Sequence, residues 1–477
     1  MEIAGTIKTA TEREKLYRKY KHLIKTDQKL DRTLVSFQAN KQEALYRWFK
    51  YKEGFSKRLV KYFINKYHPK VGHILDPFAG AGSTLFAAKE LGWDATGIEI
   101  LPVGIFAMQA RLASEKVDGK EFAKTIKEVW RKFDINKTPM NKLKNIPITK
   151  GAYPGENEKL LNLYLEHCNN ISNADIKTLF KFAAFSILEE ISYTRKDGQY
   201  LRWDYRANRS WGKTKFNKGK IYSFQEAIEK KLNQIKQDLN PVVNLELFSN
   251  NKQNWNKEPS LNILEGSSLE MLPKLETNSF DFIMTSPPYC NRYDYTRTYA
   301  LELVFLGYDD EAVKNLRQTM LSCTVENKEK YATLRSTYHN LNKLPDFEKI
   351  ASVYNSCGAM QEVNYQLQKL NHSGLLNNSN IPRMVKNYFL EMAFIIFEMH
   401  RILKPNGSVV MVNDNVRYGG EEIPVDLILS DFAESFGLTI EKIWTLPVGK
   451  GNSSQQMGNH GRTELRKCVY VWRKIAG

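Results

Sequence analysis

Residues 280–295, FDFIMTSPPYCNRYDY, contain a group of residues that could bind and orient a ligand. An apolar run stops there and two consecutive prolines follow, which fixes two φ angles and removes two backbone donors. The carbonyl groups of this stiff stretch therefore lack their usual partners. We expect the Ser286 hydroxyl and the Pro287 carbonyl to accept hydrogen bonds from a ligand. Pro288 keeps these acceptors in place, and Tyr289 offers a flat face to an aromatic ligand.

A second candidate site is the glycine turn, residues 76–84, DPFAGAGST. Its glycines allow backbone N–H groups to approach a ligand with no Cβ in the way, and the pattern fits several nucleotide-type ligands. Asp76 at its mouth would repel a phosphate and suits an ammonium group, although it could also simply cap the turn. Glu99 ends the next apolar run, where it can accept both hydroxyls of a ribose. The pattern predicts a zwitterionic ligand that carries a ribose.

The elements around these residues predict a doubly wound α/β fold. Residues 73–99 read as strand, glycine turn, helix and strand, a βαβ unit that implies a parallel sheet. The alternation stops after this unit and its following helix, resumes near residue 259, stops again and resumes from residue 383 to the end. We therefore expect a Rossmann-like sheet of about seven strands, the last one antiparallel, with two insertions. The expected divisions are an N-terminal extension (1–40), three core parts (41–112, 259–307 and 383–477), a first insertion (113–258) and a second, helical insertion (308–382).

Composition narrows the class of protein. The 477 residues carry 70 Lys and Arg against 53 Asp and Glu, a formal charge of +17 that favours a polyanionic partner. The five cysteines form no CxxC pair, so we expect neither a disulfide framework nor a metal site. No apolar stretch has the length of a membrane span, and the charged N-terminus does not read as a secretion signal. We expect a cytoplasmic protein without a membrane partner, and its oligomeric state stays open.

Together these segments resemble a known family. DPFAGAGST, Glu99 and TSPPY resemble motifs I, II and IV of the amino-group DNA methyltransferases that use S-adenosylmethionine, and residues 47–56, RWFKYKEGFS, resemble their motif X. The resemblance covers about 41–112, 259–306 and 383–474. It departs at motif III, where LEGSS has serines in place of the usual acidic residue, so Ser267 becomes the expected adenine ligand. The resemblance implies a cofactor site made of Glu53, Phe55, Ser56, Asp76, Pro77, Phe78, Gly80, Gly82, Thr84, Glu99 and Ser267.

The resemblance also implies the reaction. Such an enzyme transfers a methyl group to the exocyclic amine of a base taken out of double-stranded DNA, in a restriction-modification system of a prokaryotic cell or virus. A cognate restriction endonuclease and association with the nucleoid are implied with it. In this family a leading Ser, as in SPPY, is typical of cytosine-N4 enzymes and a leading Asp or Asn is commoner in adenine-N6 enzymes. We therefore favour N4 of cytosine, with N6 of adenine as the alternative.

Three other interpretations stay open or are disfavoured. Cys290 suggests thiolate attack on a cytosine ring carbon, but enzymes of that type place the cysteine directly after a proline, and here Tyr289 intervenes. We expect Cys290 to be a buried bystander. An RNA base methyltransferase could use the same pocket. A nucleic-acid-binding subunit with a vestigial site is the non-enzyme alternative.

A basic stretch inside the first insertion predicts where DNA is read. Residues 191–220 hold nine Lys or Arg against two Asp, with aromatic residues interleaved, which suits phosphate and base contacts. A solvated basic loop with its own small core is the alternative. The expected DNA contacts are Arg195, Lys196, Tyr200, Arg202, Trp203, Arg206 and Arg209 in this target-recognition region, and Gln455, Gln456 and Arg462 in a second loop near the C-terminus.

Overall fold

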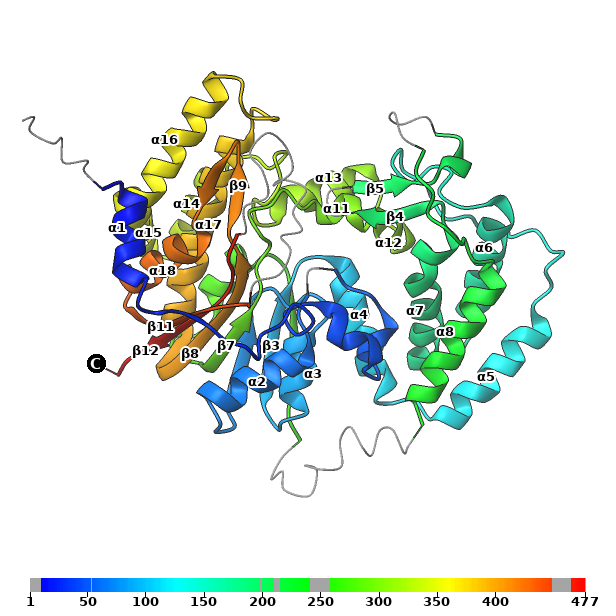
Figure 1. The fold of residues 1–477 in the computed structure, drawn as a ribbon. Helices are drawn as coiled ribbons and strands as arrows, with labels where there is room; N and C mark the ends of the chain where they lie inside the picture. Colours follow the sequence, from blue (N-terminus) through cyan, green and yellow to red (C-terminus); the bar gives the residue numbers. More distant parts are fainter. Residues whose placement is uncertain are drawn as a thin grey trace, which may run out of the picture.

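The computed structural model describes residues 10–52, 54–197, 200–209, 215–240, 258–447 and 465–476. A central sheet of eight strands dominates this fold (Figure 1). In spatial order its strands are β1 (Ile24–Thr26), β11 (Leu438–Thr445), β12 (Lys467–Lys474), β8 (Leu403–Asp414), β7 (Phe280–Thr285), β2 (His73–Asp76), β3 (Asp94–Glu99) and β6 (Leu261–Glu265).

The strand directions confirm the predicted doubly wound sheet. β8, β7, β2, β3 and β6 pair in parallel, and β12 is antiparallel to both β8 and β11. Seven of the strands match the expected number. The eighth, β1, comes from the N-terminal extension and pairs in parallel with β11.

Both faces of the sheet are buried under helices. Successive residues of a strand point to opposite faces, so neighbouring residues pack into different clusters. Ile74 packs into the cluster formed with α2 (Lys57–Tyr67) and α3 (Ser83–Lys89), whereas Leu75 packs with α17 (Ile381–Ile402) and α18 (Val425–Ser435). Helices therefore cover the sheet on two sides, and only the strand ends are free to form a site.

The first insertion builds a separate helical body beside the sheet (Figure 1). It contains α5 (Gly119–Lys132), α6 (Gly155–Asn169), α7 (Ala174–Ile191), α8 (Phe224–Asp238), the turn Tyr205–Ala207 and the hairpin β4 (Thr194–Asp197) with β5 (Tyr200–Trp203). The body shares one apolar cluster with α4 (Pro102–Ser114) and with α12 (Ala300–Phe305). Phe182 and Phe185 of α7 contact Phe49 and Phe106 of the core, which anchors the insertion.

Most of the second insertion, namely α14 (Tyr331–Asn340), α15 (Leu344–Ser356) and α16 (Gly358–His372), lies on the other side of the sheet with α1 (Glu12–Tyr20) and α17 (Figure 1). Its first helix, α13 (Asp310–Thr319), instead packs into the apolar cluster of the first insertion through Val313. The remaining elements are α10 (Ser268–Met271), α11 (Tyr295–Thr298), the strands β9 (Val416–Tyr418) and β10 (Glu421–Ile423), and short turns of helix at Phe37–Gln42, Tyr46–Trp48 and Leu272–Lys274.

Two details complete the fold. Residues 404–407, KPNG, lie inside β8, where pairing with β7 shifts register between Phe280 and Phe282 and Asn406 has a φ of 64°. Within the described ranges, every helix falls short of the length and apolarity needed to cross a bilayer.

Candidate functional site

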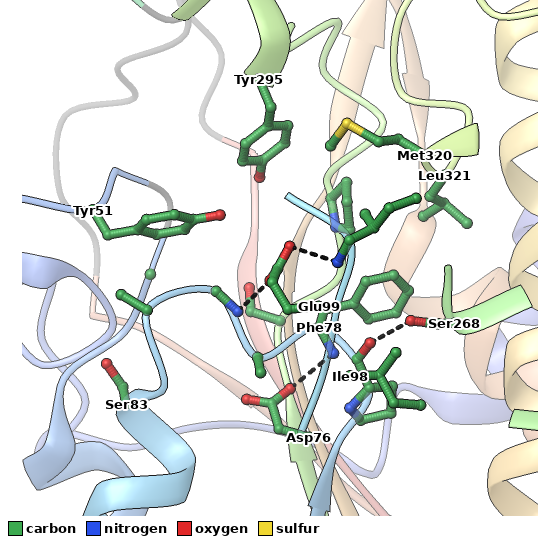
Figure 2. A pocket seen from close by; sticks show the side chains of 18 of the residues that line it. Tyr51, Asp76, Phe78, Ser83, Ile98, Glu99, Ser268, Tyr295, Met320 and Leu321 are labelled. Carbon is green, nitrogen blue, oxygen red and sulfur yellow. Dashed lines mark hydrogen bonds between the residues drawn. The ribbon is translucent and has the colours of Figure 1, made fainter. Parts of the chain in front are cut away.

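A pocket of about 900 Å³, part of it open to solvent, lies at the carboxyl ends of β2, β3, β6 and β7 (Figure 2). This is where a doubly wound sheet places ligands, because the loops that leave the parallel strands meet there. Its lining comes from distant parts of the chain: Phe37, Tyr51, Gly54 and Phe55; the residues Asp76 to Ala81 with Ser83; Ile98, Glu99, Ile100 and Arg111; Ser267, Ser268 and Leu269; and Ser286, Pro288, Tyr295, Met320 and Leu321.

The glycine turn forms one wall of this pocket and needs its glycines. Gly80 and Gly82 have φ angles of 54° and 79°, in the left-handed region. A Cβ at Gly80 would lie 3.0 Å from the Tyr51 ring, and one at Gly82 would lie 2.8 Å from Met108. The turn therefore follows a path that larger residues would strain.

Glu99 extends into the cavity between Tyr51, Tyr295 and Asp76 in the view of Figure 2. Its carboxylate accepts hydrogen bonds from the backbone N–H groups of Gly80 at 2.5 Å and Leu101 at 2.7 Å. Burial raises the pKa of Glu99 to about 7, although these backbone hydrogen bonds favour the ionised form. A fixed carboxylate of this kind can accept the hydroxyls of a ribose.

Asp76 connects the two sequence motifs. Its carboxylate accepts hydrogen bonds from the hydroxyls of Thr84 at 2.6 Å and Thr285 at 2.7 Å and from the backbone N–H of Phe78 at 3.0 Å. The side chain is 2% exposed, and burial raises its pKa to about 6. This geometry supports the capping interpretation of Asp76: it holds the start of α3 and the end of β7 against the glycine turn.

The TSPPY segment, residues 285–289, opens into the same pocket as the glycine turn. Ser286 and Pro288 line it, and the Ser286 hydroxyl donates to the Tyr289 hydroxyl at 3.2 Å. In the part of the chain that the structure describes, the Pro287 carbonyl has no hydrogen-bond partner. Cys290 is fully buried, and burial raises its pKa well above the ordinary value, as expected for a bystander thiol.

The other expected cofactor residues divide into two groups. Phe55, Pro77, Phe78, Gly80 and Ser267 line the pocket, whereas Ser56, Gly82 and Thr84 do not. Ser56 caps α2 by accepting from the Leu59 N–H, and Thr84 holds Asp76, so both shape the frame around the pocket. Glu53 lies outside the described residues.

Several lining residues were not expected from the sequence. Tyr51 lies within the stretch that resembles motif X, and Tyr295 lies ten residues after Thr285 in the stretch that first indicated chemistry. Ser268 donates to the Pro77 carbonyl and so ties α10 to the glycine turn (Figure 2). Met320 and Leu321 come from the second insertion, where no motif indicated a site.

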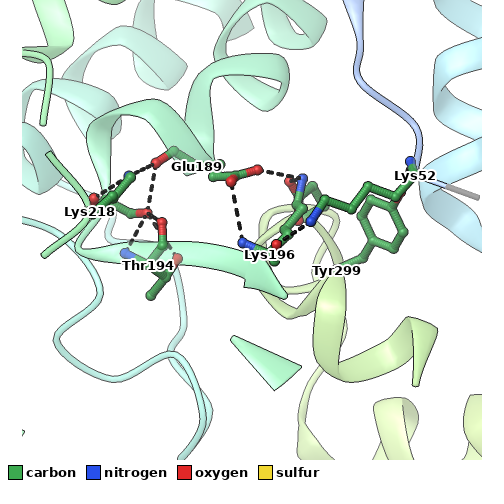
Figure 3. Close-up of polar contacts among 8 residues, drawn as sticks. Lys52, Glu189, Thr194, Lys196, Lys218 and Tyr299 are labelled. Carbon is green, nitrogen blue, oxygen red and sulfur yellow. Dashed lines mark hydrogen bonds and ion pairs between the residues drawn. The ribbon is translucent and has the colours of Figure 1, made fainter. Parts of the chain in front are cut away.

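Lys196, expected to contact DNA, lies on the inner face of the hairpin. This side chain is buried and forms an ion pair with Glu302, which is 1% exposed. Its ammonium lies 4.8 Å from the centre of the Tyr299 ring, and its carbonyl accepts a hydrogen bond from the Lys52 ammonium (Figure 3). Lys196 therefore fastens the hairpin to the core and cannot reach DNA.

The exposed face of the same hairpin carries the other expected contacts. Arg195 lies directly opposite Arg202 in the antiparallel register, and both guanidinium groups lie over the Phe216 ring, at 5.7 and 4.1 Å. Tyr200 is 51% exposed beside them, and Trp203 is half-buried.

Two further arginines of this region have partners within the protein. Arg206 pairs with the buried Asp204, whose pKa is held far below its ordinary value by that arginine. Arg209 donates to the carbonyls of Pro147 and Lys150. Gln455, Gln456 and Arg462 lie outside the described residues.

Among the described residues, no three His, Cys, Asp or Glu side chains are grouped to hold a metal ion. All five cysteines are free thiols and buried.

The sequence is similar to a known family and to curated proteins. Residues 7–103 match the family model N6_N4_Mtase, described as a DNA methylase. The chain is 46% identical over 465 residues to the type II methyltransferase M.AvaI of Anabaena variabilis, covering 96% of this chain and 92% of that protein. It is 42% identical over 480 residues to the type II methyltransferase M.BsoBI of Geobacillus stearothermophilus, covering 97% of this chain and 92% of that protein.

Proposed function

The chain belongs to the type II DNA methyltransferases, whose methyl donor is S-adenosylmethionine, and from that premise we propose that it methylates N4 of cytosine in double-stranded DNA. The methylation would be site-specific, within a restriction-modification system, and would take place in the cytoplasm on the nucleoid. The observation that carries the proposal is the shared pocket of the TSPPY segment and the glycine turn. N6 of adenine is the alternative, and the leading serine of SPPY favours cytosine.

The pocket fits S-adenosylmethionine in its chemistry. Glu99 supplies a carboxylate for the ribose hydroxyls, and Phe78, Ile98 and Ile100 with Ser267 offer an apolar wall and a hydroxyl for the adenine. Gly80 of the glycine turn and Phe55 of the stretch that resembles motif X also line the pocket, and we assign the methionine half to them. When bound, the cofactor supplies an electrophilic methyl group on its sulfonium.

The TSPPY segment would hold the substrate amine. The Ser286 hydroxyl donates a hydrogen bond to the Tyr289 hydroxyl. The lone pairs of the Ser286 oxygen therefore remain available to accept a hydrogen bond from an N–H of the base. The Pro287 carbonyl, which has no partner among the described residues, would accept the other N–H. Two acceptors favour a pyramidal nitrogen and stabilise its developing positive charge, so orientation and electrostatics supply much of the acceleration.

The exposed face of the hairpin would contact the DNA backbone. Like charges directly opposite one another in a β-ladder repel, and the partly exposed Asp197, 3.8 Å from the Arg202 guanidinium, offsets only part of this repulsion. Arg195 and Arg202 would therefore gain from a phosphate placed between them. Phe216 supports both guanidinium groups, and the exposed Tyr200 lies close enough in the hairpin to reach the same strand of DNA. The first insertion, residues 113–258, is thus the proposed target-recognition region.

The test is the identity of the modified base. Plasmid DNA would be incubated with the purified protein and S-adenosylmethionine carrying a deuterated methyl group, then digested to nucleosides for mass spectrometry. We expect labelled N4-methyldeoxycytidine. Labelled N6-methyldeoxyadenosine alone would overturn the choice of cytosine, and labelling of transfer RNA in place of duplex DNA would overturn the choice of DNA.

A further inference from the structure

Arg111, on α4, is a buried cation at the edge of the cofactor pocket. The residue is 4% exposed and lines the pocket beside Ala81. One of its nitrogens, Nη1, donates to the Ala81 carbonyl at 3.0 Å, and the guanidinium lies 4.4 Å from the centre of the Tyr46 ring and 5.2 Å from that of Phe86. Arginine has five N–H donors, so most N–H groups of the Arg111 guanidinium remain available to a ligand.

Within the described ranges, no carboxylate forms an ion pair with Arg111. The acidic residue that acts on it electrostatically is Glu90, which accepts from the Tyr46 hydroxyl and already pairs with Lys57 at 3.7 Å and Lys61 at 2.6 Å. Burial lowers the pKa of Arg111 to about 10. A buried, charged and incompletely bonded guanidinium is costly unless a ligand completes its hydrogen bonds.

We infer that Arg111 binds the carboxylate of the methionine half of S-adenosylmethionine. The inference rests on the proposed cofactor pocket and adds to it a residue that no motif indicated. Glu99 is the proposed ribose ligand, and Arg111 lines the same pocket while bonded to the Ala81 carbonyl of the glycine turn, which we assign to the methionine half. Its free donors form a planar fork that matches a carboxylate, and the stacking on Tyr46 fixes the plane of that fork.

The alternative role of Arg111 is structural, namely support of the glycine turn through the Ala81 carbonyl. The two roles predict different ligand dependence. A carboxylate ligand matters only for compounds that carry the carboxylate. Support of the turn matters for every compound that occupies the pocket.

Calorimetric titration separates the two roles. The probes are S-adenosylhomocysteine, its decarboxylated analogue and 5′-methylthioadenosine, which lacks the whole amino acid. We expect Arg111→Met to weaken S-adenosylhomocysteine by about 10- to 100-fold, the range for a lost hydrogen bond to a charged group, and to change the other two by less than about twofold. Equal weakening of all three compounds, or no change in any, would overturn the inference.

Two controls keep the outcome decisive. Arg111→Lys retains the charge and loses the fork, so it should lose affinity selectively for S-adenosylhomocysteine even if Arg111→Met does not fold. Uniform losses in Arg111→Lys would also count against a carboxylate contact. Glu99→Gln should weaken S-adenosylhomocysteine and 5′-methylthioadenosine alike, since both carry the ribose. If Glu99→Gln affects neither compound, the proposed pocket is wrong, independently of Arg111.

Discussion

Removal of the two arginines that face each other across the β4–β5 hairpin should flatten the salt dependence of DNA binding. Arg195 and Arg202 are exposed and share the Phe216 ring, so each can neutralise a phosphate and release a counterion. Each lost contact lowers the slope of log K against log salt by about 0.9, which gives about 1.8 for the pair. A fourfold rise in salt concentration would then weaken DNA binding by the wild-type chain about 12-fold more than it weakens DNA binding by the double variant.

The assay is fluorescence anisotropy of a labelled duplex titrated with protein at several salt concentrations. The test variant is Arg195→Gln with Arg202→Gln. The matched control is Lys349→Gln with Lys369→Gln, which removes the same charge from exposed positions on α15 and α16, on the other side of the molecule (Figure 1).

The control should keep the wild-type slope, because its lysines lie far from the proposed DNA surface. Equal slopes for the hairpin variant and the wild-type chain would refute the reasoning and place the DNA elsewhere. Because both arginines are exposed, thermal unfolding of the hairpin variant should stay close to that of the wild-type chain.

Three further predictions test the pocket and its support. Ser286→Ala should lower single-turnover methyl transfer by about 100- to 1,000-fold and leave the dissociation constant of S-adenosylhomocysteine unchanged, because the lost acceptor acts on the substrate amine. The affinity of 5′-methylthioadenosine should rise as pH increases through about 7, where Glu99 ionises, because the ribose hydroxyls donate to the carboxylate form; calorimetry on Glu99→Gln should show no such rise. Lys196→Met should lower the free energy of unfolding in urea by about 3–5 kcal/mol, because Glu302 stays buried without its cation, and adding Glu302→Leu should restore much of that loss.

The sign of the pH effect follows from the raised pKa of Glu99. A carboxyl whose pKa is higher in the folded protein than in the unfolded chain favours folding when it is protonated. That contribution is complete below the unfolded pKa and is lost as pH rises through about 7. The ligand acts in the opposite direction because it favours the ionised carboxylate, so its stabilising effect on the protein should be largest above about pH 7.

The core of the site was predictable because its signals are local. The glycine turn can be recognised in the sequence because its backbone needs glycine at positive φ. The proline pair of TSPPY predicts the end of a strand regardless of its neighbours. The strands β2 and β7 are short apolar runs, as expected for strands buried on both faces. These features depend on neighbours within a few residues.

Other features depend on contacts between distant residues and gave no sequence signal. β1 has three residues, one half-buried and two exposed, so its pattern does not differ from that of a loop. Met320 and Leu321 reach the pocket only because the second insertion folds back onto it. Lys196 and Arg195 look equivalent in a basic stretch, and only the pairing of β4 with β5 places them on opposite faces.

Asp76 explains how two motifs far apart in the chain act as one site. It is 209 residues from Thr285, the first residue of TSPPY, and a buried hydrogen bond of 2.7 Å joins the two side chains. The prolines make TSPPY stiff, but stiffness alone does not aim its acceptors at a ligand held by another strand. The Asp76 carboxylate fixes the orientation of TSPPY, because it accepts hydrogen bonds from Thr285 and also from Thr84 at the start of α3. Asp76 therefore fixes the position of TSPPY relative to the glycine turn. With S-adenosylmethionine and a base in the proposed pocket, that position would set the distance between methyl donor and amine, on which catalysis by proximity depends.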